Sequence, residues 1–336
     1  MWKVIPHDKV PFVLMKDQII VKTVFEFLER LHARGMSKTT IRAYAFDLLA
    51  FYRFLEWEVI PSEQFDSRRL TQFLLFQKQE KAAPRTINRR LTVVRTFLNY
   101  QSSGWGDTVF GQTGSFYKGA RNESLLGPSR LRGKKKSLSV KVPGILITPL
   151  APEEIQKFMS GLRTYRDHAI VQLMLLCGLR SCEVLALQIH DIDVIDDQLH
   201  VRGKGQKERR LPLSSSVRKA LMNYLDYERP ECSHSQCFVV LKGPHRGQPL
   251  TSEGLRKLFR NQRKQKGLKR AHAHLFRHTF ATHLIRENVS LAVVQKLLGH
   301  SDIEVTMGYV HLNLSDVSRE YARAITTLQH HEQKTT

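Results

Sequence analysis

The chain has 336 residues, enough for two domains with ordinary cores. With 41% hydrophobic and 25% charged residues, its composition is that of a globular protein, and no apolar run approaches the ~20 residues that cross a bilayer. Its 53 Lys and Arg against 31 Asp and Glu give a net charge of +22, which favours a polyanionic partner such as a nucleic acid over mere surface solubilisation.

The first residues lack the apolar core of a signal peptide, so we expect a cytoplasmic protein, or one at the nucleoid of a bacterium. Four cysteines do not make a disulfide framework. Cys232 and Cys237, with His234 and His245 nearby, form a conceivable zinc site, but their spacing matches no compact zinc motif. We therefore expect no metal.

Residues 1–103 predict a small helical bundle. Apolar residues recur at helical spacing in four segments: Ile19–Arg34, Thr39–Trp57, Ser67–Lys81 and Thr86–Gln101. Gly35 is placed to end the first helix, Ser37 to cap the second, and Pro84 to precede the fourth. The polar faces of these helices carry basic residues that are candidate DNA phosphate contacts, although a solvated helix face explains them equally well: Lys38, Arg42, Arg85, Arg89 and Arg90.

Residues 104–147 are predicted to be a long basic linker. The helical periodicity stops, glycines recur, and Arg130–Lys136 is a run of basic residues. Lys134 and Lys135 are candidate DNA contacts within it. A strap that becomes ordered on DNA and a merely flexible tether remain equally open.

Residues 148–336 are predicted to be mainly helical with one small antiparallel sheet. Gln198–Arg202 and Glu208–Leu213 are expected to be strands joined by a turn over Gly203–Lys207. The expected helices are Pro152–Leu162, Arg166–Cys177, Ser216–Glu228, Ser252–Lys264, Leu275–Arg286, Leu291–Leu297 and Asp316–Leu328.

This second half contains the residue types that phosphodiester chemistry requires: guanidinium groups for the charged oxygens, a nucleophile and proton donors. Arg180 follows Gly178, which permits a tight turn, and Glu183 stands three residues on. Alone, an Arg–Glu pair at this spacing is usually a surface contact. Lys204 occupies the predicted hairpin tip, where it either contacts a phosphate or is simply solvated. Two nearby basic residues are further candidate DNA contacts, Lys207 and Arg209.

Histidines gather downstream. His274 and Arg277 share one face at the start of a predicted helix, where the helix dipole favours an anion. His274 and His278 are spaced for a metal, but no carboxylate lies between them as in the H-E-x-x-H arrangement, and we expect His278 and His283 to be structural or packing residues.

The last candidate residues lie near the C-terminus. His300 stands nine positions before Tyr309, close enough for a short helix to bring both to one site. On its own, Tyr309 is typical of a partly buried aromatic residue.

Together these stretches resemble the phage integrase and Xer family, the tyrosine recombinases. The motifs G-L-R-x-x-E, G-K-G-x-K-x-R-x-x-P-L, H-L-F-R-H-T-F-A-T-H-L, L-G-H-S and Y-V-H occur in the family's order over Ile147–Leu312. The resemblance implies a helical core-binding domain and a catalytic domain that form a clamp on DNA. It also implies a homotetramer on two double-stranded recombination sites, with no membrane partner, and a C-terminal helix, here Asp316–Leu328, docked on a neighbour.

The resemblance implies a role for each motif residue. Tyr309 matches the nucleophile that forms a 3′-phosphotyrosyl bond, and Arg180 and Arg277 match the arginines that clamp the scissile phosphate. The remaining assignments are Lys204 as general acid toward the leaving 5′-oxygen, His274 in acid–base work, His300 as a donor to the phosphate, and Glu183 as the acidic partner of the first arginine. No cofactor is implied, because one ester is exchanged for another.

Alternatives remain at this stage. The long linker, around Phe116–Gly119, is reminiscent of mobile-element integrases and transposases, whereas the motifs equally fit an Xer-like recombinase that resolves chromosome or plasmid dimers. A type IB topoisomerase, a non-catalytic DNA-binding protein and, more remotely, a zinc hydrolase are the other possibilities.

Overall fold

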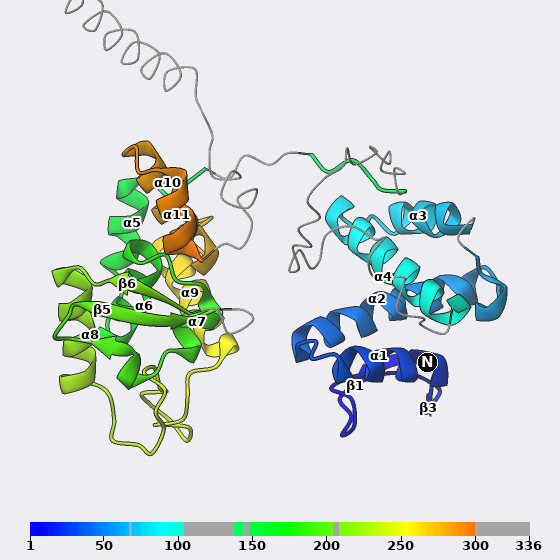
Figure 1. Cartoon of the computed structure of the whole chain (residues 1–336), viewed down its shortest axis with the longest axis horizontal. Coiled ribbons are helices and arrows are strands. Elements are labelled where there is room, and N and C mark those ends of the chain that lie inside the picture. Colours follow the sequence, from blue (N-terminus) through cyan, green and yellow to red (C-terminus); the bar gives the residue numbers. More distant parts are fainter. Residues whose placement is uncertain (67–68, 104–137, 144–147, 204–207, 300–336) are drawn as a thin grey trace, which may run out of the picture. The chain divides into compact units, whose positions relative to one another are not determined.

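The computed structural model describes residues 1–66, 69–103, 138–143, 148–203 and 208–299. The chain divides into two compact units, Met1–Gly144 and Ile145–Thr336, each with its own hydrophobic core (Figure 1). Within these residues, no helix combines the length and apolarity that a membrane span requires. The predicted domains 1–103 and 148–336 therefore fall in separate units.

The first unit is a helical bundle around α2. Aromatic side chains fill its core, and Phe27, Phe51, Phe54, Phe73 and Phe97 are all fully buried. Several of these rings meet edge to face, the geometry that aromatic quadrupoles favour. The described helices are α1 (Lys22–Ala33), α2 (Lys38–Trp57), α3 (Leu70–Gln79) and α4 (Pro84–Ser103), with a 3-10 turn at Ser62–Gln64.

The two helix boundaries predicted from capping residues are confirmed. Ser37 is the N-cap of α2, and its Oγ accepts a hydrogen bond from the Thr40 backbone N–H at 3.2 Å. Gly35 follows the end of α1 with φ +75°, the left-handed conformation that ends a helix at little cost for glycine.

The prediction of a helix beginning at Ile19 is wrong, because a small sheet precedes α1. Strands β1 (Trp2–Ile5), β2 (Val13–Lys16) and β3 (Ile19–Ile20) pair antiparallel in that order and pack against α1 and α2 (Figure 1). Asp17 and Gln18, with φ 47° and 70°, make the two-residue turn between β2 and β3. The turn lacks the Asn-Gly signature typical of such hairpins, so no local pattern predicts it.

Part of the predicted linker packs on the first unit. The Asn88 side chain on α4 donates to the Val140 carbonyl at 2.9 Å and accepts from the Val140 N–H at 2.7 Å. Arg95 on the same helix donates to the Leu138 carbonyl, and both Leu138 and Val140 lie against the core. Residues 138–143 therefore continue the first unit, whereas Lys134 and Lys135 lie outside the described residues.

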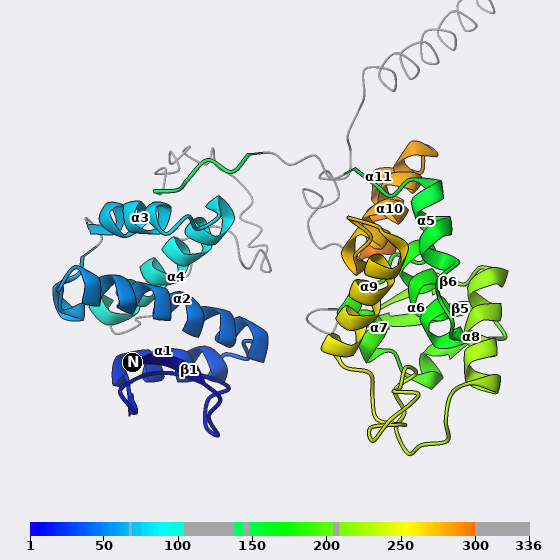
Figure 2. The same cartoon turned by 180° about the vertical axis from the view of Figure 1, so that it is seen from behind.

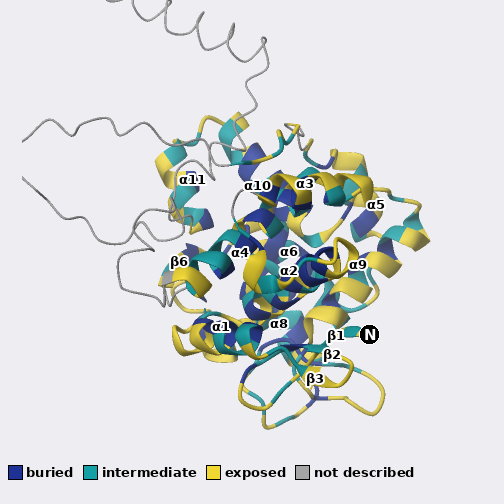
Figure 3. Ribbon diagram, turned by 90° about the vertical axis from the view of Figure 1, so that its right-hand side faces the viewer, coloured by how far each residue is buried: buried dark blue, intermediate teal, exposed yellow. Residues whose placement is uncertain are grey.

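The second unit is built around α6, which packs between α8 and α10. In both views α8 and α9 lie at opposite sides of this unit (Figures 1 and 2). Much of α9 is exposed, with Leu255 and Phe259 turned into the core (Figure 3). The described helices are α5 (Pro152–Met159), α6 (Tyr165–Leu176), α7 (Ser181–Ala186), α8 (Ser215–Tyr227), α9 (Ser252–Lys266), α10 (Ala273–Arg286) and α11 (Leu291–Leu298), with a 3-10 turn at Ile189–Asp191.

The sheet of this unit is antiparallel, as predicted, with the order β4-β5-β6. Strands β5 (Gln198–Arg202) and β6 (Glu208–Pro212) are the two predicted ones, and β4 (Ile192–Asp193) adds a third. Val201 on β5 stands opposite Arg209 on β6. Two elements were not predicted, β4 and α7, because a segment of two or six residues is too short to show a period. The predicted C-terminal helix, Asp316–Leu328, lies outside the described residues.

The Asn88 contact predicts a specific change in protease resistance. We expect Asn88→Ala to remove both hydrogen bonds to Val140 and to increase trypsin cleavage at Lys141 about tenfold, since two net hydrogen bonds are worth roughly 1–3 kcal/mol. The matched control is Thr96→Ala, also on α4, whose hydroxyl bonds only within its own helix. Mass spectrometry of the fragments measures the cleavage at Lys141. Equal cleavage at Lys141 in the two variants would contradict this interpretation.

Candidate active site

Five of the residues predicted for the site lie among the described residues, and three of them are arginines paired with the carboxylate of a fourth, Glu183. They are Arg180, Glu183, Arg209, His274 and Arg277. Four others lie outside the described residues, namely Lys204, Lys207, His300 and Tyr309. The described part of the site comes from α7, β6, α10 and α11.

Arg180 is held at the start of α7 by Glu183. Arg180 is the N-cap residue, and Glu183 Oε2 accepts its backbone N–H at 2.9 Å while Oε1 accepts its Nη1 at 2.7 Å. Gly178 makes the preceding turn with φ +65°, and a Cβ there would clash with the Phe280 ring. The turn expected at Gly178 is thus present, and Glu183 orients both the backbone and the guanidinium of Arg180.

Arg209 is the other direct partner of Glu183. Its Nη1 donates to Oε1 at 3.0 Å and its Nη2 to Oε2 at 2.8 Å, a two-pronged ion pair of the strong kind. Only 9% of the Arg209 side chain is exposed, against 2% for Glu183. The sequence predicted Arg209 to be a DNA contact, but the structure gives its guanidinium two partners inside the protein.

Arg277, which lies on α10, is the third arginine near Glu183. It is the largest fully buried side chain of the chain's described residues, and its Nη1 lies 3.6 Å from Glu183 Oε2. The same Nη1 donates to the Gly178 carbonyl. We call Glu183 with Arg180, Arg209 and Arg277 the arginine cluster.

The C-terminal end of α11 provides the other acceptors for the arginine cluster. The Leu298 carbonyl accepts from Arg277 Nη2 at 2.8 Å and from Arg180 Nη1 at 3.3 Å. The Leu297 carbonyl accepts from Arg209 Nε at 2.8 Å. Unpaired carbonyls make this end of a helix partly negative, so it suits guanidinium groups. All three arginines are therefore fixed both to Glu183 and to α11.

The electrostatics keep Glu183 ionised. Burial alone would raise its pKa and is the largest single influence, but the hydrogen bonds and charges of Arg209 and Arg180 outweigh it and lower the pKa to about 2. One carboxylate then faces three guanidinium groups, which leaves a positive excess. Arg180, at 35% exposure, is the member that reaches solvent, and among the described residues nothing accepts from its Nε or Nη2. The arginine cluster is thus suited to hold an anion such as a phosphate.

His274 lies beside the arginine cluster on the first turn of α10 and is exposed. Its pKa is lowered, first by partial desolvation and then by the positive charges of Arg277, His272 and Arg180. A neutral imidazole at neutral pH can accept a proton, as acid–base work requires.

The other histidines of α10 differ from one another. His278 is buried, in agreement with the predicted structural or packing role, whereas His283 is exposed, so it does not pack in the interior and a structural role for it stays a prediction. Among the described residues, no group of three or more His, Cys, Asp or Glu side chains is arranged to hold a metal ion.

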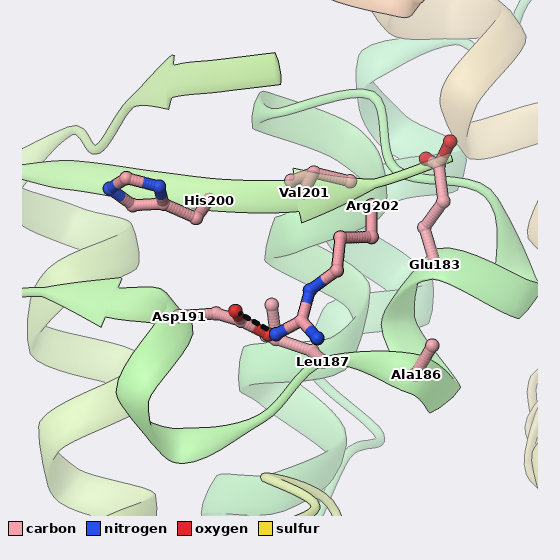
Figure 4. Close-up of a pocket in the computed structure, with 7 residues that line it drawn as sticks. All are labelled: Glu183, Ala186, Leu187, Asp191, His200, Val201 and Arg202. Atoms are coloured by element: carbon pink, nitrogen blue, oxygen red, sulfur yellow. Dashed lines mark hydrogen bonds and ion pairs between the residues drawn. The ribbon is translucent and has the colours of Figure 1, made fainter. Parts of the chain in front are cut away.

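A small pocket lies on the other side of Glu183. Its lining includes Leu187, Asp191 and Arg202, with an ion pair between Asp191 and Arg202 (Figure 4). In this view the Glu183 carboxylate points away from Arg202. Arg202 is consequently neutralised within its own pair and takes no part in the arginine cluster.

In the first unit, the predicted DNA contacts differ in whether they are paired with another side chain of the protein. Lys38, Arg42 and Arg85 are exposed, and the Arg42 guanidinium lies 4.9 Å from the centre of the Phe46 ring. Arg89, by contrast, donates to the buried Asp47 at 2.8 Å while about half of its side chain stays exposed.

The buried, paired position of Asp47 was not predicted from the sequence. Asp47 is 1% exposed, and besides Arg89 the Arg90 Nε lies 3.7 Å from its Oδ1. Burial raises its pKa, and the hydrogen bond from Arg89 opposes that effect. An acidic residue three positions after Tyr44 and four before Phe51, on the apolar face of α2, was the signal that marked it.

The pKa of Glu183 predicts how stability depends on pH. A carboxyl group shifted from 4.5 to about 2 stabilises the fold fully above its unfolded pKa, and this contribution is lost as pH falls toward 2. We expect Glu183→Gln to lower the free energy of unfolding by roughly 3 kcal/mol at pH 7, with the gap to the unmodified chain narrowing to about 1 kcal/mol at pH 3.

Chemical denaturation at both pH values measures this difference. The control is Glu253→Gln, which removes an exposed carboxylate paired with Arg256 and should change stability by less than about 0.5 kcal/mol. A gap that stays constant between pH 7 and pH 3 would show that Glu183 does not carry the proton linkage.

Comparison with known proteins places this geometry in a family. Residues 149–315 match the model of the phage integrase family, and residues 24–103 match that of the phage integrase N-terminal SAM-like domain. Transposase A of transposon Tn554 from Staphylococcus aureus is 31% identical over 348 residues, 95% of each chain. Tyrosine recombinase XerC of Herpetosiphon aurantiacus is 32% identical over 293 residues, 87% of this chain and 90% of that one.

Among solved structures, the XerH site-specific recombinase bound to a palindromic difH substrate superposes with a TM-score of 0.65 at 22% identity, covering 94% of this chain and 90% of that one. This likeness shows the same fold. The matched family models, the identity over nearly the whole length and the arginine cluster at the matching motifs agree with one another. The chain belongs to the phage integrase family and is a tyrosine recombinase, an enzyme of site-specific DNA recombination.

Proposed function

We propose that this recombinase moves a mobile element by cutting and rejoining DNA with Tyr309 as nucleophile. The observation that carries the proposal is the arginine cluster, in which Arg180 and Arg277 share one ionised carboxylate, Glu183, and one acceptor at the end of α11, the Leu298 carbonyl. Two neighbouring guanidinium groups can bind one anion through two of its oxygen atoms. The scissile phosphate is the anion that this family acts upon.

Cleavage exchanges one phosphate ester for another. The Tyr309 hydroxyl attacks the phosphorus, a new P–O bond forms to the 3′ side of the break, and the bond to the 5′-oxygen breaks. Arg180 and Arg277 bind the non-bridging oxygens, where negative charge grows in the transition state. His274, neutral at physiological pH, takes part in proton transfer at the nucleophile, and Lys204 protonates the leaving 5′-oxygen. His300 donates a further hydrogen bond to the phosphate.

Rejoining is the reverse reaction with a different 5′-hydroxyl. Exchanging a phosphodiester for a phosphotyrosyl ester conserves bond energy, so neither a nucleotide nor a metal is required. Two rounds of exchange pass through a Holliday junction. We propose that a homotetramer on two double-stranded sites performs them, with Asp316–Leu328 as the contact between neighbours. The action belongs in the bacterial cytoplasm, at the nucleoid.

The choice of a mobile element rests on the relatives. The match to transposase A of Tn554 extends over 95% of both chains, whereas the match to XerC covers 87% of this chain. The alternative is resolution of chromosome or plasmid dimers, the role of an Xer-like recombinase. Sequencing the DNA that becomes attached to Tyr309 in the host separates the two, since a transposon end supports the first and a chromosomal or plasmid resolution site the second.

Substitution of the nucleophile tests the chemistry. We expect Tyr309→Phe to bind DNA with unchanged affinity and to form no covalent adduct on a nicked suicide substrate, because the only change is the lost hydroxyl. The adduct is measured as a shifted band on a denaturing protein gel. A covalent adduct that survives this substitution would overturn the assignment of Tyr309.

Relaxation of supercoiled DNA separates this function from that of a type IB topoisomerase. On a plasmid without a recombination site we expect no relaxation beyond the level of Tyr309→Phe. Rapid relaxation that depends on Tyr309 would favour the topoisomerase.

The first unit is proposed to bind DNA backbone through Lys38, Arg42, Arg85 and Arg89, with Arg90 beside them. We expect Arg42→Ala to weaken binding to all DNA sequences alike and to reduce the slope of log K against log salt by about 1. Lys78→Ala is the control, because Lys78 is exposed on α3, which carries none of the predicted contacts. Fluorescence anisotropy at several salt concentrations measures both slopes, and equal slopes for the two variants would remove Arg42 from the interface.

A further inference from the structure

Arg209 is the one arginine of the arginine cluster to which the family resemblance gives no catalytic role, and the sequence alone presented it as one more basic residue for DNA. Its surroundings point elsewhere. The strand alternation of β6 turns Arg209 toward the interior, while its neighbours Glu208 and Arg210 are exposed. All three nitrogen atoms of its guanidinium are used, by both oxygens of Glu183 and by the Leu297 carbonyl.

This set of contacts joins three parts of the site. Arg209 lies two residues after the segment 204–207 that contains Lys204, Glu183 lies on α7 beside Arg180, and Leu297 lies in the last turn of α11, just before His300. A planar fork that binds three acceptors fixes their relative positions, which a flexible ammonium group would not do. Arg209 therefore fixes strand β6, the turn at Arg180 and the end of α11 relative to one another. We call these three connected segments the frame.

A glycine gives independent evidence that the end of α11 packs closely against Arg209. Gly299 ends α11 with φ +64°, and a Cβ at this position would come within 3.0 Å of Arg209 Nη1 and 3.2 Å of its Cδ. Gly267 ends α9 with a similar φ of +61°, yet no atom lies within 4 Å of its Cβ position. Gly299 thus needs to be glycine both for its backbone conformation and for the space that Arg209 occupies.

We propose that Arg209 is a positioning residue of this recombinase: it does not contact DNA, and it holds Glu183 and the C-terminal end of α11 so that Arg180 and Arg277 stand ready for the scissile phosphate. The proposal deepens the proposed function and rests on it. Glu183 is faced by Arg180 from α7, Arg209 from β6 and Arg277 from α10, with the Cys177 thiol near Arg209 at the end of α6.

The test compares Arg209→Gln with Arg210→Gln in the full-length protein. Both substitutions remove one positive charge from the same strand, but only the first residue faces the arginine cluster. At saturating nicked suicide DNA, we expect Arg209→Gln to form the covalent adduct about 100-fold more slowly, since small misplacements of catalytic groups have effects of this size. Its DNA affinity and salt slope should match those of the unmodified protein, and Arg210→Gln should keep the normal adduct rate.

A conservative variant separates charge from geometry. Arg209→Lys keeps the charge but loses the fork, so we expect it to recover at most about a tenth of the normal adduct rate. Full recovery by lysine would contradict positioning by the fork. A reduced salt slope with a normal adduct rate at saturating DNA would instead make Arg209 a DNA contact and overturn the proposal.

The glycine pair tests the same frame without touching Arg209. Gly299→Ala and Gly267→Ala both place alanine in a left-handed conformation, at a similar backbone cost. We expect only Gly299→Ala to slow adduct formation while leaving DNA affinity unchanged. This comparison stays informative even where Arg209→Gln folds poorly.

Amide hydrogen exchange in the DNA-free protein tests the positioning role of Arg209 without measuring catalysis. Arg209→Gln and Gly299→Ala should speed exchange at residues 296–299, the last turn of α11, and Gly267→Ala should not. Unchanged exchange there in both variants overturns the positioning role. If the unmodified protein forms no adduct on DNA, the proposed function fails, and the exchange data alone then decide whether Arg209 holds the frame.

Discussion

One buried carboxylate governs the arrangement of the catalytic domain. Glu183 is almost fully buried, and a carboxylate in that position costs several kcal/mol unless it is paired and hydrogen-bonded. Its partners come from three elements that are distant in sequence: the start of α7, strand β6 and helix α10. These elements have to come together for Glu183 to be buried at all, so the fold and the cluster form together.

The same constraint explains how three guanidinium groups can gather around one carboxylate. Like charges repel one another, and the repulsion grows as water is excluded. Glu183 and the carbonyls of Leu297 and Leu298 offset it, which allows Arg277 to be fully buried while Arg180 stays partly open. A site organised in this way holds its positive charge in place before an anion arrives, which is the form of electrostatic preorganisation that favours charged transition states.

The sequence predicted much of this chain because its signals are local. Helical spacing, Ser37 and the glycine turns lie within a few residues of the structures they specify, and the family motifs singled out Arg180, Glu183, His274 and Arg277. What it did not predict depends on partners distant in sequence. The sheet of residues 2–20 uses a turn without glycine, and the inward side chain of Arg209 is defined by Glu183 and α11. A basic residue in a basic sequence shows no sign of a partner 26 positions away.

A second buried carboxylate, Asp47 in the first unit, shows which feature separates a rigid site from an adaptable one. Both oxygens of Glu183 are bonded, and its pKa falls, whereas among the described residues only Oδ1 of Asp47 has a hydrogen-bond partner and its pKa rises. The difference follows from geometry, because Arg89 approaches Asp47 with a single nitrogen and remains about half exposed. Arg89 therefore stays accessible to solvent while Arg90 lies beside Asp47 and is less exposed. Arg209, by contrast, bonds both oxygens of Glu183 through two nitrogen atoms and is only 9% exposed, so the buried carboxylate and its arginine hold each other in one orientation.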